Sequence, residues 1–223
     1  MKFSALVFIM ICIVSEMGLT QTIDASLELS QINLRSLEDD NGHYNGGGDG
    51  DGIIFRIGVD SIPGDFHFVR YELGVKNERS NLSLTGGGQG GSIHYETEFE
   101  KTVLFGAVYP LNLRFAKFFQ FSAGAQGNLL LHNKYSSNHS SSLVTGLSSS
   151  SFDSGSGKEK HNSFYLSLTL RQSLTIPINK KLSVQGIVYY TRNSLRELDT
   201  FLKVSSRSLS AGLGATWNLD ATN

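Results

Sequence analysis

The residues of this sequence that could act in catalysis include a His-x-Ser unit at residues 161–163. A serine hydrolase needs a His that takes the proton of a nucleophilic Ser, and His161 and Ser163 are candidates for these two roles. Glu159 or Asp153 could orient the imidazole, as the acid of a serine hydrolase does. No G-x-S-x-G motif occurs in the chain, so this catalytic interpretation depends on one short unit.

Histidines and loop carboxylates are possible ligands of a divalent metal ion, but their spacing does not form a ligand set. The segment 48–52 lacks the register of a calcium loop. The glycine-rich segment 85–91 lacks the Lys-Ser/Thr of a phosphate loop, so we interpret it as a flexible loop. We expect no metal and no cofactor. The residues interpreted as solvated loop residues are His43, His94, His132, His139, His161, Asp39, Asp40, Asp49 and Asp51.

The composition limits the class of protein. The chain has 223 residues, a net charge of −1, 17 % charged residues, 24 glycines, 3 prolines and one cysteine. A nucleic-acid binder needs a basic surface, and neither the charge balance nor any Lys/Arg run supplies one. The charged fraction is below the roughly 25 % of an ordinary soluble domain. The protein therefore has fewer charged residues than we expect for a surface that is fully in contact with water.

The N-terminus is typical of a secretory signal peptide. A lysine precedes an unbroken apolar run over residues 5–14, and the small residues Gly18 and Thr20 follow it. This run is too short for a transmembrane helix, which needs about 20 residues, and no longer run follows. We assign residues 1–20 to the signal peptide, with cleavage after Thr20, and residues 21–223 to one mature domain. Cys12 leaves with the signal peptide.

Period-two alternation of apolar and polar residues runs through the mature domain and predicts β-strands. In the last segment, Leu209 and Leu213 lie on one face while Ser208 and Ser210 lie on the other. The first segment slips its phase at Gln31, which predicts a β-bulge. Eight strands are predicted, at residues 27–34, 53–59, 69–75, 103–109, 119–132, 164–171, 182–190 and 208–219.

The connections between these strands alternate between two kinds. Long connections rich in Gly, Ser, Asn or Asp lie at residues 36–52, 77–92, 133–162 and 193–206. Short connections lie at residues 61–64, 112–116 and 176–181, and the three prolines lie in or beside them. The predicted fold class is all-β: an eight-stranded antiparallel up-and-down β-barrel with long loops at one end and short turns at the other. Within the third long connection, we expect the serine-rich residues 136–156 to be mobile.

The two faces of the strands indicate which side of the barrel meets water. The polar face consists mainly of Ser, Gly, Thr, Gln and Asn, which are small enough to fill a narrow lumen. The opposite face is bulky and aliphatic, which suits lipid, and aromatic residues such as Tyr109 and Trp217 lie near strand ends. A soluble carrier would instead need a polar outer face dense in Lys and Glu. We therefore predict a transmembrane β-barrel and keep a secreted, soluble ligand-binding barrel as an alternative.

These patterns resemble those of the small eight-stranded outer-membrane barrels of Gram-negative bacteria, the OmpA/OmpX-like architecture, over residues 23–219. The resemblance implies a location in the bacterial outer membrane, contact with outer-membrane lipid and insertion by the outer-membrane assembly machinery. Such families end in a terminal aromatic residue, whereas Trp217 is followed here by residues 218–223. The unit at His161 and Ser163 resembles the His-x-Ser of outer-membrane lipid A deacylases, but Phe164 and Tyr165 differ from the residues after the serine in that family.

Charged residues on the inward face are expected to pair, because an unpaired charge inside a narrow barrel is costly. The predicted lumen charge network consists of Glu28, Arg56, Arg70, Glu72, Glu96, Glu98, Glu100 and Arg171. Eight strands leave little space for a continuous water path, so a structural plug is favoured over the gate of a pore.

The sequence thus predicts a non-enzymatic outer-membrane protein whose barrel is a membrane anchor. Its long loops would contact an unidentified extracellular partner in a structural, adhesive or receptor-like role, with no nucleic acid involved. Two alternatives remain beside the soluble barrel: a narrow, porin-like passive pore, and a lipid-modifying hydrolase that uses His161 and Ser163.

Overall fold

β-Strands make up nearly all of the chain that the computed structural model describes, which comprises residues 20–36, 44–61, 69–88, 90–115, 118–143, 146, 148–157, 164–193, 196–199 and 202–219. The predicted signal peptide up to residue 19 lies outside these ranges, as do Glu159, His161 and Ser163. The loop residues Asp39, Asp40 and His43 also lie outside them. Within the described ranges, no helix is long and apolar enough to cross a membrane.

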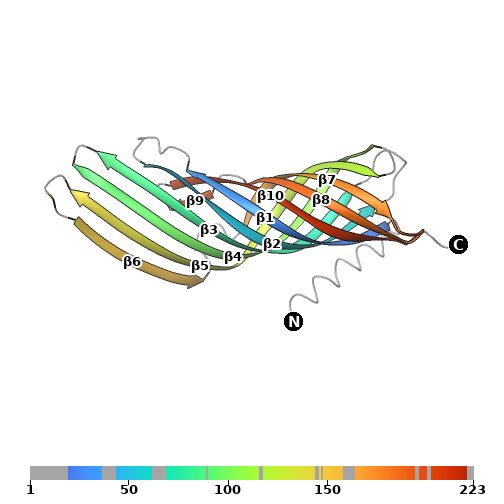
Figure 1. The fold of residues 1–223 in the computed structure, drawn as a ribbon, viewed down its shortest axis with the longest axis horizontal. Helices are drawn as coiled ribbons and strands as arrows, with labels where there is room; N and C mark the ends of the chain where they lie inside the picture. Colours follow the sequence, from blue (N-terminus) through green and yellow to red (C-terminus); the bar gives the residue numbers. More distant parts are fainter. Residues whose placement is uncertain are drawn as a thin grey trace.

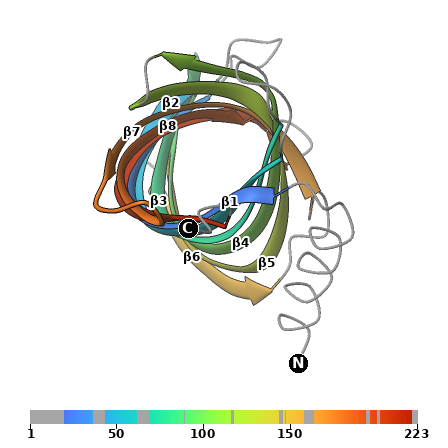
Figure 2. The same cartoon turned by 90° about the vertical axis from the view of Figure 1, so that its right-hand side faces the viewer.

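Eight strands form a closed barrel. The described residues contain ten strands, of which all but β6 and β9 form this ring: β1 (Thr20–Ser36), β2 (Tyr44–Ser61), β3 (Arg70–Gly88), β4 (Gly91–Phe115), β5 (Phe119–Leu143), β6 (Ser148–Gly157), β7 (Phe164–Pro177), β8 (Leu182–Asn193), β9 (Arg196–Asp199) and β10 (Leu202–Asn218). They pair in the order β1-β2-β3-β4-β5-β7-β8-β10, and β10 pairs with β1 to close the ring (Figure 2). Among the described residues, β6 pairs with β5 and β9 pairs with β10, and neither strand belongs to the ring. The predicted all-β, eight-stranded up-and-down barrel is confirmed.

The apolar face of the strands points outward. Leu168 and Leu213 are each 70 % exposed, whereas the polar residues Thr169 and Ser210, which follow the opposite phase, are buried. A bulky apolar exterior around a polar lumen is the arrangement of a barrel that spans a lipid bilayer. It contradicts the alternative of a soluble carrier, which needs the opposite orientation.

On seven of the eight ring strands, the apolar exterior ends sharply toward the end of the barrel away from the termini. We call this border the upper boundary of the apolar belt. Going outward across it, an outward-facing apolar residue is followed by a polar one: Leu29 by Gln31, Ile53 by Asp51, Val75 by Asn77, Leu104 by Thr102, Leu131 by His132, Tyr190 by Arg192 and Leu209 by Arg207. The agreement of neighbouring strands defines one edge of the lipid-facing surface.

Several strands continue far beyond this boundary (Figure 1). β3 and β4 remain paired up to Gly88 and Gly91, and β5 and β6 remain paired up to Ser142 and Ser148. We call residues 77–88 of β3, 91–102 of β4, 132–143 of β5 and all of β6 the protruding sheet. It occupies most of two predicted connections, so the loop interpretation of residues 77–92 and of residues 136–156 was wrong.

Small polar residues explain this difference between sequence and structure. Gly and Ser weaken a strand signal, yet their backbones pair as well as any others once two strands lie side by side. Cross-strand hydroxyl contacts add to the pairing, with Ser92 and Ser142 2.8 Å apart and Thr97 and Ser137 2.9 Å apart. An apolar cluster of Leu82, Leu84 and Phe99 packs on the inward side, with Leu34, Tyr95 and Tyr135 against it.

The predicted bulge at Gln31 is also absent. Gln31 pairs in continuous register with Leu209 on β10 and with Asp51 on β2, and its side chain is exposed. The break in the pattern is a single polar residue at the upper boundary. Register shifts within the ring occur in the β1–β2 pairing between Thr20 and Thr22, and in the β4–β5 pairing between Thr102 and Val103 and between Val108 and Leu111.

Candidate functional site: a charge network in the barrel lumen

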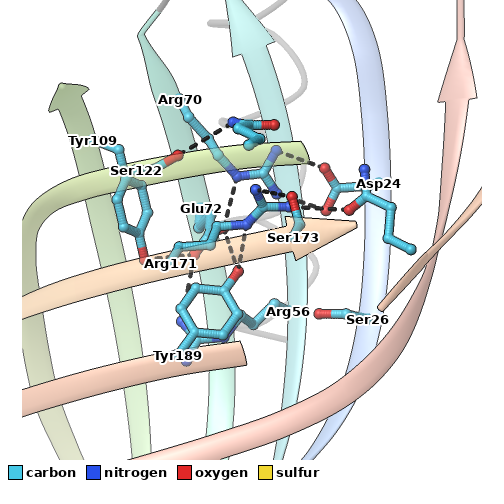
Figure 3. A network of polar contacts seen from close by, with 12 residues as sticks. Asp24, Ser26, Arg56, Arg70, Glu72, Tyr109, Ser122, Arg171, Ser173 and Tyr189 are labelled. Carbon is cyan, nitrogen blue, oxygen red and sulfur yellow. Dashed lines mark hydrogen bonds and ion pairs between the residues drawn. The ribbon is translucent and has the colours of Figure 1, made fainter. Parts of the chain in front are cut away.

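Alternate residues of the barrel strands project their charged groups into the lumen (Figure 3). Of the eight residues in the predicted network, the structure brings five together: Glu28 on β1, Arg56 on β2, Arg70 and Glu72 on β3, and Arg171 on β7. All five are at most 2 % exposed. The strand phase therefore places both signs of charge in the same narrow space.

Glu72 is the centre of the network. Its Oε1 accepts hydrogen bonds from Nε of Arg70 at 2.7 Å and from the hydroxyl of Tyr189 at 2.6 Å. Its Oε2 accepts from the hydroxyl of Tyr109 at 2.9 Å and from Nη1 of Arg56 at 3.4 Å. Arg171 completes the shell, with its Nε 3.5 Å from Oε1. Five side chains thus satisfy one carboxylate that has no contact with bulk water.

Arg70 joins this centre to two further carboxylates. Its Nη2 donates to Asp24 Oδ1 at 2.7 Å, and its Nη1 donates to Asp60 Oδ1 at 2.9 Å. Nη1 also lies 2.7 Å from Asp24 Oδ2. Thr22 donates to the other oxygen of Asp60 at 3.1 Å. Arg70 therefore ties β3 to both β1 and β2.

Arg56 is held by charge on one side and by aromatic rings on two others. Its Nε donates to Glu28 Oε1 at 2.8 Å. The guanidinium carbon lies 3.8 Å from the centre of the Tyr189 ring and 4.5 Å from that of Phe105. Such cation–π contacts gain strength where water is excluded. Ser210 donates to the second oxygen of Glu28 at 2.7 Å, which adds β10 to the network.

Arg171 anchors the network to β7 and β8. It donates from Nη1 to Ser173 at 2.9 Å, from Nη2 to Gln185 at 3.0 Å and from Nε to the Tyr189 hydroxyl at 3.1 Å. The Tyr189 hydroxyl thus accepts from Arg171 and donates to Glu72. Every N–H-bearing nitrogen of this arginine has an acceptor inside the protein.

A second polar layer crosses the remaining wall of the barrel. Gln126 donates to Asn128 at 2.6 Å, and Asn128 donates to Ser167 at 2.8 Å. Ser167 donates to Asn193 at 2.5 Å, and Asn193 donates to Ser206. This chain links β5, β7, β8 and β10, so hydrogen-bonded groups also fill the lumen beside these strands.

The network can hold the barrel walls together and block passage. Three guanidinium groups face four carboxylates, those of Asp24, Glu28, Asp60 and Glu72, so charge is nearly balanced. Near the outer end of the lumen lies a cavity of about 40 Å³, lined partly by Ile32, Phe99 and Tyr165. It has space for a water molecule or two and for no larger solute.

Glu96, Glu98 and Glu100 do not belong to the network. They lie exposed on the outward face of the protruding sheet, and Glu100 pairs there with Arg79 at 3.3 Å. On β4 the lumen side carries Val103 and Phe105, so both faces are apolar within the barrel. The prediction that these three glutamates face the lumen was therefore wrong, because polarity does not distinguish the two faces of this strand.

The sequence interpretation also missed network residues. Asp24 and Asp60 lie just outside the predicted strands, four residues from Glu28 and Arg56 on the same faces. Extending the period-two pattern by two steps would have found them. The roles of Tyr109 and Tyr189 had no signal in the sequence, because an aromatic residue suits a lipid girdle as well as a lumen.

Within the described residues, no group of three or more His, Cys, Asp or Glu side chains is placed to hold a metal ion. The carboxylates of the lumen are occupied by arginines and hydroxyl groups instead. The described site therefore joins the strands of the barrel to one another through ion pairs and hydrogen bonds across the lumen.

The sequence matches no protein-family model and no curated protein. In fold, the chain is similar to the outer membrane protease OmpT from Escherichia coli, with 8 % identity, 90 % of this chain and 97 % of that chain covered and a TM-score of 0.39. It is similar to the outer membrane protein OprG from Pseudomonas aeruginosa, with 12 % identity, 91 % and 98 % coverage and a TM-score of 0.39. A third is Ail, the attachment invasion locus protein of Yersinia pestis, with 10 % identity, 86 % and 98 % coverage and a TM-score of 0.32. Because similarity of this size carries little weight, the barrel fold rests on the strand pairing and burial of this chain.

Proposed function

We propose that this protein is a non-enzymatic outer-membrane anchor that presents the protruding sheet to the outside of a bacterial cell for contact with another surface. The observation that carries the proposal is the combination of a filled lumen with strands that continue far beyond the apolar belt. The barrel holds the sheet in place, and the sheet makes the contact.

The filled lumen argues against transport as the main role. Arg70, Glu72 and Arg171 are at most 1 % exposed in the middle of the barrel. A pore would need a continuous row of hydrated groups, whereas these groups bind one another. Opening such a network would leave charges unpaired, which is costly in a site without water.

The protruding sheet is larger than membrane insertion requires. A membrane-crossing strand needs about 9–11 residues, while β4 and β5 have 25 each. The excess residues 91–102 and 132–143 pair with each other over their whole length, and β6 continues the sheet. In the part of the chain that the structure describes, β6 pairs with β5 alone, so its other edge offers backbone groups to a partner.

A bacterial adhesion assay tests this role. We would replace residues 138–152, the end of the β5–β6 hairpin, by an Asn-Gly turn that rejoins the paired Ser137 and Asp153. Cells that produce the wild-type protein should attach to protein-coated surfaces or to one another more than cells without it. The shortened variant should lose this gain, because the contact surface is shorter while the barrel is intact.

The control carries changes at the opposite end, Lys180→Gln and Lys181→Gln in the β7–β8 turn, which should leave attachment unchanged. Heat-modified gel mobility would show that all variants fold to equal levels in the membrane. Equal attachment by the shortened variant and the wild type would contradict the proposed role.

A further inference from the structure

Two arginines face each other on the outer surface of the barrel. Arg192 on β8 is directly opposite Arg207 on β10, and both side chains are exposed. Arg207 is in turn opposite Asn33 on β1, and the exposed Arg35 lies two residues further along that strand. Three neighbouring strands therefore bring three outward-facing arginines together. We call these residues, Arg35, Arg192 and Arg207, the arginine cluster.

The cluster lies at the upper boundary of the apolar belt. Two residues toward the membrane from the opposed pair are Tyr190 and Leu209, which are 38 % and 52 % exposed and face outward. A tyrosine in this position is typical of the interface between hydrocarbon and headgroups. The guanidinium groups are thus at the depth where lipid headgroups lie.

Among the described residues, these three arginines make no hydrogen bond or ion pair through their side chains, in contrast to the arginines of the lumen. An exposed carboxylate, that of Asp49 on β2, lies opposite Asn33 on the same outward face. Side chains directly opposite in an antiparallel pair have Cβ atoms about 5 Å apart, and like charges in that position destabilise the pair. An anion bound between Arg192 and Arg207 would remove this repulsion.

Small residues lie in the apolar belt below the pair. Ala211 lies opposite Val188, and the next residue of β8 on this face is Gly186, where an added Cβ would meet nothing within 4 Å. Small outward-facing residues leave space for a hydrocarbon chain against the barrel wall. The surface thus combines cations at headgroup depth with small apolar residues beneath them.

We propose that the arginine cluster binds the phosphate of an anionic lipid in the outer leaflet, with an acyl chain packed against the small residues Gly186 and Ala211. Guanidinium groups bind phosphate oxygens in bidentate fashion, and basic side chains at a membrane surface attract anionic lipids. The proposal rests on the membrane location and orientation proposed above, but not on what the protruding sheet contacts.

Lipid retention by the purified full-length protein tests the site. The protein would be reconstituted in phosphatidylcholine nanodiscs that contain either bisphosphorylated lipid A or the same lipid without phosphates, and then washed in neutral detergent. The wild type should retain the phosphorylated lipid at least ten-fold more strongly. The Arg192→Gln, Arg207→Gln double variant should lose that preference, and each single variant should lose part of it.

The matched control removes two exposed charges from the other end of the barrel, by Lys180→Gln and Lys181→Gln, and should keep the ten-fold preference. Inorganic phosphate should displace no more lipid than chloride of equal ionic strength; full displacement by phosphate would assign the site to a free anion and overturn the proposal. Equal retention by the double variant and the wild type would also overturn it. Because purified protein is used, a negative result here is distinct from a negative result in the adhesion assay.

Discussion

The hydroxyl of Tyr189 on β8 lies 2.6 Å from Oε1 of Glu72 on β3, although 117 residues separate them in the sequence. In the ring of eight strands, β3 and β8 are four positions apart in either direction, so this hydrogen bond joins opposite walls of the barrel. Neighbouring strands are already held by backbone pairing. The Tyr189–Glu72 bond adds a tie across the lumen that the backbone cannot provide.

Removing the charge of Glu72 should strongly destabilise the barrel. Glu72→Gln would leave Arg70, Arg56 and Arg171 without their common partner, and breaking a buried ion pair costs about 3–5 kcal/mol. Tyr189→Phe removes the hydroxyl that donates to Glu72 and accepts from Arg171, and each hydrogen bond to a charged group is worth about 1.5–3 kcal/mol. Urea unfolding in lipid vesicles, followed by Trp217 fluorescence or gel mobility, would measure both.

The exposed pair of Arg79 and Glu100 supplies the control for these variants. Its side chains are 77 % and 52 % exposed, so Glu100→Gln should change the free energy of unfolding by no more than about 1 kcal/mol. An effect of Glu72→Gln as small as that of Glu100→Gln would show that the lumen network contributes no special stability.

The same network should prevent ion conduction. Wild-type protein in planar bilayers should show no steady channel current, because Arg70 and Arg171 are bound to carboxylates and hydroxyl groups across the lumen. The double variant Arg70→Ala, Arg171→Ala removes much of the filling and should give measurable current. Large and stable channels from the unmodified protein would instead favour the pore.

The barrel could be predicted because lipid and lumen impose opposite demands on alternate residues. Leu168 and Thr169 meet these demands clearly, so the strand and its orientation follow from the sequence. On β4 the lumen side is apolar at Val103 and Phe105, so the two faces of this strand do not differ in polarity. For this reason Glu96, Glu98 and Glu100 were predicted on the inward face, although they face outward. Period-two alternation is therefore informative only where the two faces differ.

The geometry of the charge network was less predictable than its existence. Strand phase placed Glu28, Arg56, Arg70 and Glu72 in the lumen, and burial of charge required that they pair. Which atoms meet depends on the stagger of eight strands around the ring, which no local pattern contains. The bond from Tyr189 to Glu72 is a product of that closure.

A glycine beside the network should be sensitive to substitution. At Gly58 an added Cβ would lie 2.1 Å from Nη2 of Arg70 and 2.9 Å from Oδ1 of Asp24. The guanidinium cannot move away without losing its carboxylates, so Gly58→Ala should lower the free energy of unfolding by about 1–3 kcal/mol. At Gly186 nothing lies within 4 Å, and Gly186→Ala should be nearly neutral. Equal effects of the two variants on urea unfolding would contradict the close packing around Arg70.

Arginine substitutions should reveal the depth of the apolar belt. Leu213 is 70 % exposed and lies near the middle of the outward face of β10, so Leu213→Arg should cost about 2–4 kcal/mol. Asn81 faces outward on β3 beyond the upper boundary, and Asn81→Arg should have little effect on folding into vesicles. Tolerance of both substitutions would place the bilayer elsewhere on this surface.

The orientation of the barrel in the cell should follow from the position of the protruding sheet. The signal peptide predicted for the chain would remove Cys12, so single cysteines can be introduced without background from the mature protein. Ser149→Cys, on β6, should react with a membrane-impermeant maleimide on intact cells, because its strand extends beyond the apolar belt. Lys180→Cys lies in the turn between β7 and β8, beside the C-terminal end of β10, where Lys181 accepts a backbone hydrogen bond from Asn218. It should react only after the outer membrane is opened. The reverse result would mean that the short turns, and not the protruding sheet, face the outside, and the sheet would then have its partner within the cell envelope.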